Sequence, residues 1–311
     1  MILYAAQDPG PNVYIKLFLK KTKYKKKNIK NFLELKNINK KKIDFVITGT
    51  ALGNSLDKKI VKWAKKNKIL SISVIEHWTL FRERFHLKKK YYYPDFILVN
   101  DNAAKQLAIS DGIPREKIII SGNLILKRIL EKKKKIKILK NKNILFISEP
   151  ISEQYSRSML SLYGYDEFKT LKYIIKNKPN DYKITIKIHP KEKVNKYSKF
   201  SSFVKIIKNK NLSILSKNYF YIIGMTSMLL IELGIIRNDI ISFRPNSKIK
   251  FFICKAGLAK NVTSELELKK NFKVKPRNNN KKFLNQINSF SIKTDSLLDL
   301  IKKKYRQKFV V

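Results

Sequence analysis

The chain has almost no cysteine and very little histidine. Cys254 is the single cysteine in 311 residues, which excludes a disulfide framework and a cysteine-based zinc site and fits a reducing compartment. The three histidines, His77, His86 and His189, include no His-x-x-x-His pair, which argues against a zinc site built from imidazoles. We therefore expect neither a bound metal nor a cofactor.

Targeting and membrane-spanning segments are missing as well. The first residues, MILYAAQD, lack the basic region and the long apolar core of a signal peptide. No window approaches the roughly 18 uninterrupted apolar residues that cross a membrane. The sequence thus predicts a soluble cytoplasmic protein, with at most a peripheral contact with the anionic inner face of a membrane.

Several catalytic signatures are also absent. The sequence has no Gly-x-x-x-x-Gly-Lys-Ser/Thr loop, no Gly-x-Gly-x-x-Gly after its first predicted strand and no Gly-x-Ser-x-Gly elbow. These absences argue against a kinase, a P-loop NTPase, a dehydrogenase and a serine hydrolase.

Acidic residues are few, because 23 Asp and Glu stand against 69 Lys and Arg and give a formal net charge of +46. Arg supplies only nine of the basic residues, whereas surfaces that read bases and phosphates favour the guanidinium fork. The lysines are spread through every segment, which favours a compositional origin over a nucleic-acid-binding surface. A surface for anionic lipid headgroups or acidic glycans is the alternative, and in either case the charge attracts an anionic substrate.

Apolar β-branched runs alternate with segments of helical spacing in both halves, which predicts parallel βαβ units. In the first half we expect strands at residues 2–6, 43–48, 69–75, 95–100 and 117–121, helices at 13–19, 56–67 and 103–110, and a turn at 8–12. In the second half we expect strands at 144–148, 183–188, 203–207, 212–215, 219–223 and 239–243, and helices at 164–177, 228–236, 283–290 and 295–305.

These elements predict an α/β fold of two Rossmann-like domains that face each other across a cleft. We place an N-terminal, acceptor-side domain at residues 1–126, a basic linker at 127–142 and a C-terminal, nucleotide-donor domain at 143–311. The lysine-rich run at residues 20–30 is expected to be a solvated loop or helix face. A cleft between the carboxyl ends of two such sheets is the default ligand site.

The most informative motif is His189-Pro190-Lys191. It follows the strand predicted at 183–188, so His189 is expected at the carboxyl end of that strand, where open α/β sheets bind ligands. A positioned imidazole can donate to a phosphoryl oxygen and stabilise a leaving phosphate, with Lys191 adding charge. The alternative is a histidine that caps the strand and bonds only to the backbone.

A second motif, Thr226-Ser227, precedes the helix predicted at 228–236. Its hydroxyls are explained by helix capping or by phosphate binding at the positive end of the helix, and the two roles are compatible. Glu232 lies in the second turn of this helix. It either accepts hydrogen bonds from a ribose or a base, or faces solvent.

The segment after the first predicted strand contains Asp8 and Gly10. Asp8 is a candidate general base, because it is expected to project from the carboxyl edge of the sheet. Gly10 permits a ligand to approach the backbone closely. The alternative is a plain Asp-Pro-Gly turn with a helix cap.

The segment after the strand predicted at 69–75 contains Glu76, His77, Arg82 and Arg84. Two of the nine arginines occur here beside aromatic residues, which is unusual for a plain loop. We expect these four side chains to bind an acceptor or to line the cleft. An interdomain cluster of salt bridges is the alternative.

Taken together, the motifs resemble bacterial glycosyltransferases of the GT-B architecture, in particular the sialyl- and polysialyltransferase-like families of capsule and surface-polysaccharide assembly. Those families carry a His-Pro motif and a Ser/Thr-Ser motif, matched here by His189-Pro190 and Thr226-Ser227. Ser148-Glu149-Pro150 is also similar to that group, and residues 118–123 are similar to nucleotide-sugar epimerases and transferases more widely. The acid-acid-Gly motif of the sialyltransferases is not intact, because Asp8-Pro9-Gly10 keeps one acid and the glycine at a different spacing.

The residues and the resemblance together give the expected site. Asp8 and His189 are expected to be catalytic, and the nucleotide donor to bind Gly10, Ser148, Glu149, Pro150, His189, Pro190, Lys191, Thr226, Ser227 and Glu232. The resemblance implies metal-independent transfer from a CMP- or UDP-sugar to a glycan or lipid-linked acceptor, with no nucleic-acid partner. The alternatives are a nucleotide-sugar 2-epimerase or hydrolase of the same fold, and a nonenzymatic basic protein that binds nucleic acid or membrane.

Overall fold

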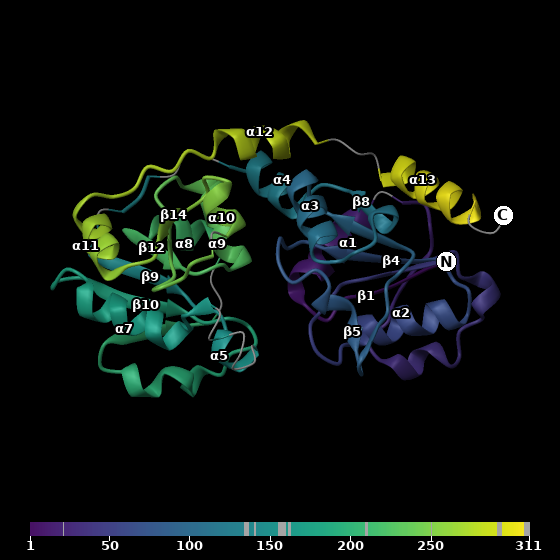
Figure 1. The fold of residues 1–311 in the computed structure, drawn as a ribbon, viewed down its shortest axis with the longest axis horizontal. Helices are drawn as coiled ribbons and strands as arrows, with labels where there is room; N and C mark the ends of the chain where they lie inside the picture. The colour runs from purple at the N-terminus through teal and green to yellow at the C-terminus, as the bar shows by residue number, and fades with distance from the viewer. Residues whose placement is uncertain are drawn as a thin grey trace. The chain divides into compact units, whose positions relative to one another are not determined.

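The computed structural model describes residues 1–20, 22–133, 137–139, 141–154, 160, 163–208, 211–249, 251–290 and 294–307. The chain divides into two compact units. Unit 1 comprises Met1–Arg128 and Ile287–Val311, and unit 2 comprises Ile129–Gln286. Each unit contains a six-stranded parallel sheet with helices packed on it, as Figure 1 shows.

Unit 1 contains the parallel strands β1 (Ile2–Ala5), β2 (Lys26–Asn28), β3 (Phe45–Thr48), β4 (Ser71–Ile75), β7 (Phe96–Val99) and β8 (Ile118–Ile120), in the order β2-β1-β3-β4-β7-β8. Its helices are α1 (Pro9–Leu19), α2 (Leu56–Lys66), α3 (Asn102–Ser110) and α13 (Thr294–Gln307), and α4 (Leu124–Glu131) begins in it. Shorter elements are an antiparallel pair, β5 (His86–Leu87) and β6 (Lys90–Tyr91), and the 3-10 turns Phe32–Leu35, Lys40–Lys42, Glu83–Phe85 and Arg115–Lys117.

Successive residues of the first strand divide between two cores of unit 1. Ile2 packs with Tyr14 and Phe18 of α1, whereas Leu3 packs with Ile60 and Ala64 of α2. Side chains of a strand point alternately to opposite faces, so a strand that is apolar at every position is buried on both. The sheet of unit 1 therefore lies between two layers of helices.

Unit 2 contains the parallel strands β9 (Asn143–Ile147), β10 (Lys183–Lys187), β11 (Val204–Ile207), β12 (Tyr221–Gly224), β13 (Ile241–Phe243) and β14 (Lys260–Val262), in the order β11-β10-β9-β12-β13-β14. Its helices are α5 (Ile151–Gln154), α7 (Glu167–Asn177), α8 (Leu212–Lys217), α9 (Met228–Ile236), α10 (Phe252–Lys255) and α11 (Glu265–Lys273), with a 3-10 segment at Val194–Phe200. The helix α12 (Lys281–Ser289) crosses the boundary to unit 1.

The start of α1 corrects the predicted turn at residues 8–12. The helix already begins at Pro9, with Asp8 in the extended conformation of an N-cap. A proline at the first helical position loses no hydrogen bond, because the first backbone N–H groups of a helix have no partner within it. The prolines that suggested a turn therefore open a helix.

Two further segments differ from the prediction. Residues 212–215, predicted as a strand, form α8, because the side chain of Asn211 accepts the backbone N–H of Ser213 and caps a helix start. The lysine-rich run at residues 20–30 includes the edge strand β2, whose lysine side chains are exposed. Charged lysine side chains on an edge strand discourage pairing of that strand with other chains.

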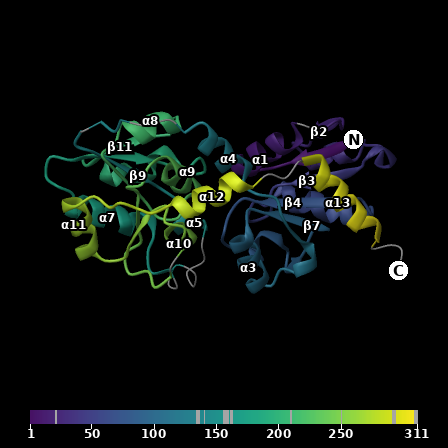
Figure 2. The ribbon, with the colours of Figure 1, turned by 90° about the horizontal axis from the view of Figure 1, so that it is seen from above.

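The C-terminal helix α13 belongs to unit 1, although the sequence placed it with residues 143–311. Leu297, Leu298 and Ile301 are buried in the core that contains Ile2 and Phe45, and Figure 2 shows α13 beside β3 and β7. The first residues of the predicted linker at 127–142 continue α4, and the boundary between the two units falls after Arg128. Residues 134–136 and 140 of that linker lie outside the described part of the chain.

Within the described part of the chain, no helix combines the length and the apolar character needed to span a membrane.

Candidate functional site

Three neighbouring strands of unit 2 end at one edge of the sheet. The central strand β9 pairs with β10 on one side and with β12 on the other, and Ile147 is opposite both Lys187 and Gly224. The segments that follow these strands contain Ser148 to Pro150, His189 to Lys191, and Thr226 to Ser227. The strand pairing thus brings these predicted donor-site residues together at the carboxyl edge of one sheet, where α/β proteins bind ligands. Figure 1 labels the three strands β9, β10 and β12.

His189 lies in a tight turn that is closed by Glu192. The backbone N–H of His189 donates to the Glu192 carboxylate at 2.6 Å, and the carbonyl oxygen of His189 accepts the backbone N–H of Glu192 at 2.9 Å. The backbone N–H of Lys191 donates to Nδ1 of His189 at 3.2 Å. A neutral imidazole whose Nδ1 accepts a hydrogen bond carries its proton on Nε2, so Nε2 is the donor nitrogen.

Thr226 and Ser227 have different roles in the structure. The carboxylate of Glu149 accepts the backbone N–H of Thr226 at 2.6 Å and the hydroxyl of Thr226 at 2.8 Å. Ser227 is the N-cap of α9, and its hydroxyl oxygen accepts the backbone N–H of Leu229 at 3.2 Å. The hydroxyl pair predicted as one unit is therefore divided between a link to β9 and a helix cap.

Burial raises the pKa of Glu149 above its ordinary value, although hydrogen bonds from Thr226 and from the backbone of Ser227 lower it in part. Burial also raises the pKa of Glu232, to about 7. Glu232 is half-buried in the second turn of α9. Two carboxylates of altered acidity therefore lie on the elements that form this edge.

Unit 1 has its own cluster of acidic residues, where α1 begins and β4 ends. Gly10 packs against the carboxylate of Glu76: a side chain at position 10 would place its first carbon 2.7 Å from Oε1 of Glu76, so the carboxylate would have to shift. Glu76 is 4% exposed, and within the described residues its Oε2 has no hydrogen-bond partner. Burial raises the pKa of Glu76 to about 7; Arg84 opposes this change, and Asp8 adds to it.

The predicted acceptor-side residues do not form one cluster. His77 lies beside Glu76, with 3.6 Å between Nε2 and Oε1. The guanidinium of Arg84 is buried and donates to the carbonyl oxygens of Thr50 and Thr79. Arg82 is exposed, and its guanidinium lies over the ring of Tyr91. Glu76 and His77 are therefore the members of this group at the sheet edge.

Sequence reasoning missed two groups beside these sites. Glu192 organises the His189 turn, and its position three residues after a histidine at a strand end was the available signal. Asn100 follows β7, directly beside the end of β4, and is 4% exposed. Its side-chain oxygen accepts from Asn123 at 3.1 Å, while its Nδ2 has no hydrogen-bond partner among the described residues.

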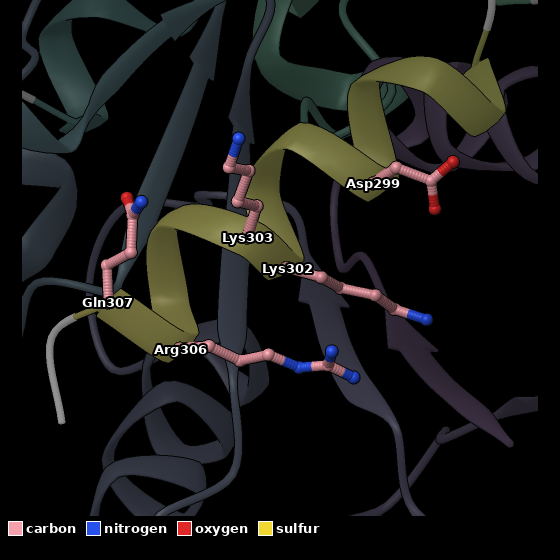
Figure 3. A pocket seen from close by; sticks show the side chains of 5 residues that line it. All are labelled: Asp299, Lys302, Lys303, Arg306 and Gln307. Atoms are coloured by element: carbon pink, nitrogen blue, oxygen red, sulfur yellow. The ribbon is translucent and has the colours of Figure 1, made fainter. Parts of the chain in front are cut away.

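A hollow of about 480 Å³ lies along α13, and none of its lining residues is a predicted site residue. Its lining residues are Asp299, Lys302, Lys303, Arg306 and Gln307. Figure 3 shows Lys302 and Arg306 extending side by side from one face of the helix. Among the described residues there is also no group of three or more His, Cys, Asp or Glu side chains arranged to hold a metal ion.

No protein-family model and no curated protein matches this chain. Solved structures do resemble it. The UDP-GlcNAc 2-epimerase of Methanocaldococcus jannaschii, in complex with UDP-GlcNAc and UDP, is 17% identical with a TM-score of 0.58, and the match covers 92% of this chain and 98% of that one. The UDP-N-acetylglucosamine 2-epimerase of Rickettsia bellii is 13% identical with a TM-score of 0.59, covering 98% and 97% of the two chains.

A variant of the wall teichoic acid polymerase TagF is 14% identical, with a TM-score of 0.50 and coverage of 100% of this chain and 90% of that one. These likenesses show the fold, two parallel-sheet α/β units of the GT-B-like kind, and confirm the predicted fold class. They do not show the sialyltransferase-like family, which stays a prediction from the sequence motifs.

Proposed function

We propose that the protein is an enzyme that acts on a nucleotide-activated sugar and that unit 2 binds the nucleotide. The observation that carries the proposal is the meeting of His189, Thr226 and Ser227 at the carboxyl edge formed by β10, β9 and β12. Its support from outside the chain is the likeness to a 2-epimerase solved with UDP-GlcNAc and UDP.

The residues at this edge suit the parts of a nucleoside diphosphate. The first backbone N–H groups of α9, after its N-cap Ser227, attract an anion together with the positive end of the helix dipole. The Nε2–H of His189 is a further donor for a phosphate oxygen and stabilises the charge of a departing phosphate. The carboxylate of Glu232 accepts hydrogen bonds and repels anions, so it suits the hydroxyls of a ribose.

Among the reactions of nucleotide sugars, we favour one that needs no acceptor, which is epimerisation or hydrolysis. The likeness to two 2-epimerases supports this choice. Unit 1 supplies Glu76, whose pKa of about 7 suits a group that takes up and releases a proton near neutrality. Asp8 contributes a second carboxylate whose charge acts on Glu76.

Transfer to a glycan or lipid-linked acceptor is the second candidate. It is supported by the likeness to the polymerase TagF and by the His-Pro and Ser/Thr-Ser motifs of the sequence. In this reaction Asp8 would be the base that accepts the proton of the acceptor hydroxyl. Both candidates place the nucleotide on the same residues of unit 2.

Calorimetric titration with UDP, CDP, GDP and CMP tests the nucleotide site. We expect one or more of these nucleotides to bind, and the His189→Ala variant to bind it roughly 10-fold or more weakly, as the loss of a hydrogen bond to a charged group implies. His86→Ala is the matched control, because His86 is a half-exposed histidine of unit 1. If no nucleotide binds, or if both variants bind like the unmodified protein, the proposal is overturned.

Incubation with nucleotide sugars separates the two reactions. Isomerised or hydrolysed sugar, detected by proton NMR without any acceptor, supports the first candidate. Intact donor that is consumed only after an acceptor is added supports the second. We expect either reaction to continue in EDTA, since we propose that it needs no metal.

A further inference from the structure

The buried carboxylate of Glu192 links the segments that follow two neighbouring strands, β9 and β10. Its Oε2 accepts the backbone N–H of His189 at 2.6 Å, and its Oε1 accepts the hydroxyl of Ser148 at 2.8 Å and that of Tyr197 at 3.2 Å. Ser148 follows β9, and His189 comes two residues after the end of β10. The Glu192 side chain is completely buried, so these hydrogen bonds are not exchanged with water.

Lys196 supplies the positive charge that this buried carboxylate needs. Its Nζ lies 2.7 Å from Glu192 and 2.9 Å from Glu153, and it also contacts Glu167. The Lys196 side chain is 6% exposed and lies near the ring of Phe168. Burial by itself lowers the pKa of Lys196. Its three carboxylate partners raise the pKa by more than burial lowers it, so the lysine stays charged.

Buried charges are a costly way to stabilise a fold. Apolar residues of the same shape often stabilise a core as well or better, whereas removing one partner of a buried pair is strongly destabilising. A buried ionic group with several hydrogen bonds does fix geometry, because each oxygen has one defined set of donors. Here the donors that Glu192 fixes include the backbone of the one histidine at the proposed nucleotide site.

We infer that Glu192, held by Lys196, is a positioning residue for His189. It fixes the turn in which the backbone N–H of Lys191 holds Nδ1 of the imidazole, and so keeps the proton on Nε2 for the phosphate. This inference rests on the proposed function, because it assigns His189 a phosphate to bind. Neither Glu192 nor Lys196 touches the nucleotide in this scheme.

A double-mutant cycle with UDP, or with whichever nucleotide binds most tightly, tests the inference. We expect Glu192→Gln to weaken nucleotide binding about 5- to 30-fold when His189 is present and less than about twofold in the His189→Ala background, because coupled residues are not additive. A carboxylate that only stabilises the fold would change binding equally in both backgrounds. Equal effects therefore overturn the inference.

Glu167→Gln is the matched control. Glu167 is equally buried and shares Lys196 with Glu192, but its other hydrogen bonds go to Ser152. We expect this variant to leave nucleotide affinity within about twofold in both backgrounds, because Lys196 keeps its contacts with Glu192 and Glu153, and Glu192 keeps its hydrogen bond to the His189 backbone. Should Glu192→Gln fail to fold, Glu192→Asp keeps the charge beside Lys196, withdraws the oxygen from the His189 backbone and is expected to show the same coupling.

A readout that needs no nucleotide separates this inference from the proposed function. The chain has three histidines, so nitrogen NMR of the imidazoles can be assigned with His77→Gln and His86→Gln variants. We expect the Nε2–H tautomer for His189 in the unmodified protein and a mixture of tautomers in Glu192→Gln. An unchanged tautomer overturns the positioning role, whereas a changed tautomer without any nucleotide binding overturns only the proposed function.

Discussion

The carboxylate of Glu149 binds both donors of Thr226, its backbone N–H at 2.6 Å and its hydroxyl at 2.8 Å, and so joins the ends of β9 and β12. Both residues were predicted to bind the nucleotide donor. The structure shows that the two partners bind each other at the edge where we propose the phosphates to lie. A negative charge at this edge has a measurable consequence.

We expect Glu149→Gln to bind UDP more tightly than the unmodified protein. The amide keeps the size of the side chain but removes a charge that repels phosphate, an effect of roughly 1 kcal/mol, or about fivefold, for partly screened charges. Titration calorimetry at pH 8 measures the change, with the surface variant Glu265→Gln as the control. Weaker binding would instead show that the carboxylate is needed to hold Thr226 for the ligand.

Glu76 is expected to make the stability of the protein depend on pH. Its pKa is raised from 4.5 to about 7, so the folded protein holds a proton between these values that the unfolded chain has released. The stabilisation from this proton is complete below about pH 4.5 and is lost as the pH rises through about 7. Glu76→Gln should therefore be more stable than the unmodified protein at pH 8, by about 1–3 kcal/mol, and similar to it at pH 4.5.

Urea unfolding at the two pH values measures this difference. An equal effect of the substitution at both would contradict the raised pKa. In the proposed reaction the same variant should lose turnover by at least about 100-fold, as expected for a missing acid–base group, while nucleotide binding is kept.

Glu232 is expected to distinguish ribonucleotides from deoxyribonucleotides. A carboxylate that accepts from ribose hydroxyls contributes about 1.5–3 kcal/mol, so UDP should bind at least about tenfold better than its 2′-deoxy analogue. Glu232→Ala should abolish this preference. Because burial raises the pKa of Glu232 to about 7, the preference should increase as the pH rises from 6 to 8. A preference that survives in Glu232→Ala would place the ribose elsewhere.

Arg82 and Arg84 are expected to differ sharply in their effect on stability. Arg84→Ala leaves the carbonyl oxygens of Thr50 and Thr79 without their buried donor, which should cost about 2–4 kcal/mol. Arg82→Ala removes an exposed guanidinium from the ring of Tyr91 and should cost less than about 1 kcal/mol. Denaturant unfolding of both variants measures the difference, and similar losses would contradict the structure.

The positions of His189 and Thr226 show that a local sequence pattern can predict which residues lie at a strand end. Each follows a short β-branched run, and parallel strands end at the same sheet edge, so the two were expected to lie near each other. The pairing of β9 with both β10 and β12 meets that expectation within unit 2. The link from Glu149 to Thr226 was not predicted, because it spans 77 residues and depends on which strand is central.

Residue type alone also did not predict that Arg82 and Arg84, two residues apart, have different environments. Arg82 and Arg84 were predicted to act together, yet one is exposed and the other is buried among backbone carbonyls. Residues 212–215 were misassigned because four residues of mixed polarity fit a strand and a short helix equally well. For Arg84 a deciding contact comes from Thr50, 34 residues away, whereas the start of α8 is set by the neighbouring Asn211.

The sequence by itself determined the fold class, since alternating apolar runs of strand and helix period can be buried only as helices packed on parallel sheets. It also located the strand ends that carry His189 and Thr226. Only the tertiary structure decided that α13 completes the core of unit 1 and that Glu192 and Lys196 support the His189 turn. The physical reason is that an apolar helix face can pack on many different sheets, and a charged side chain can pair with many different partners. Only the packing of the whole chain selects one sheet and one set of partners.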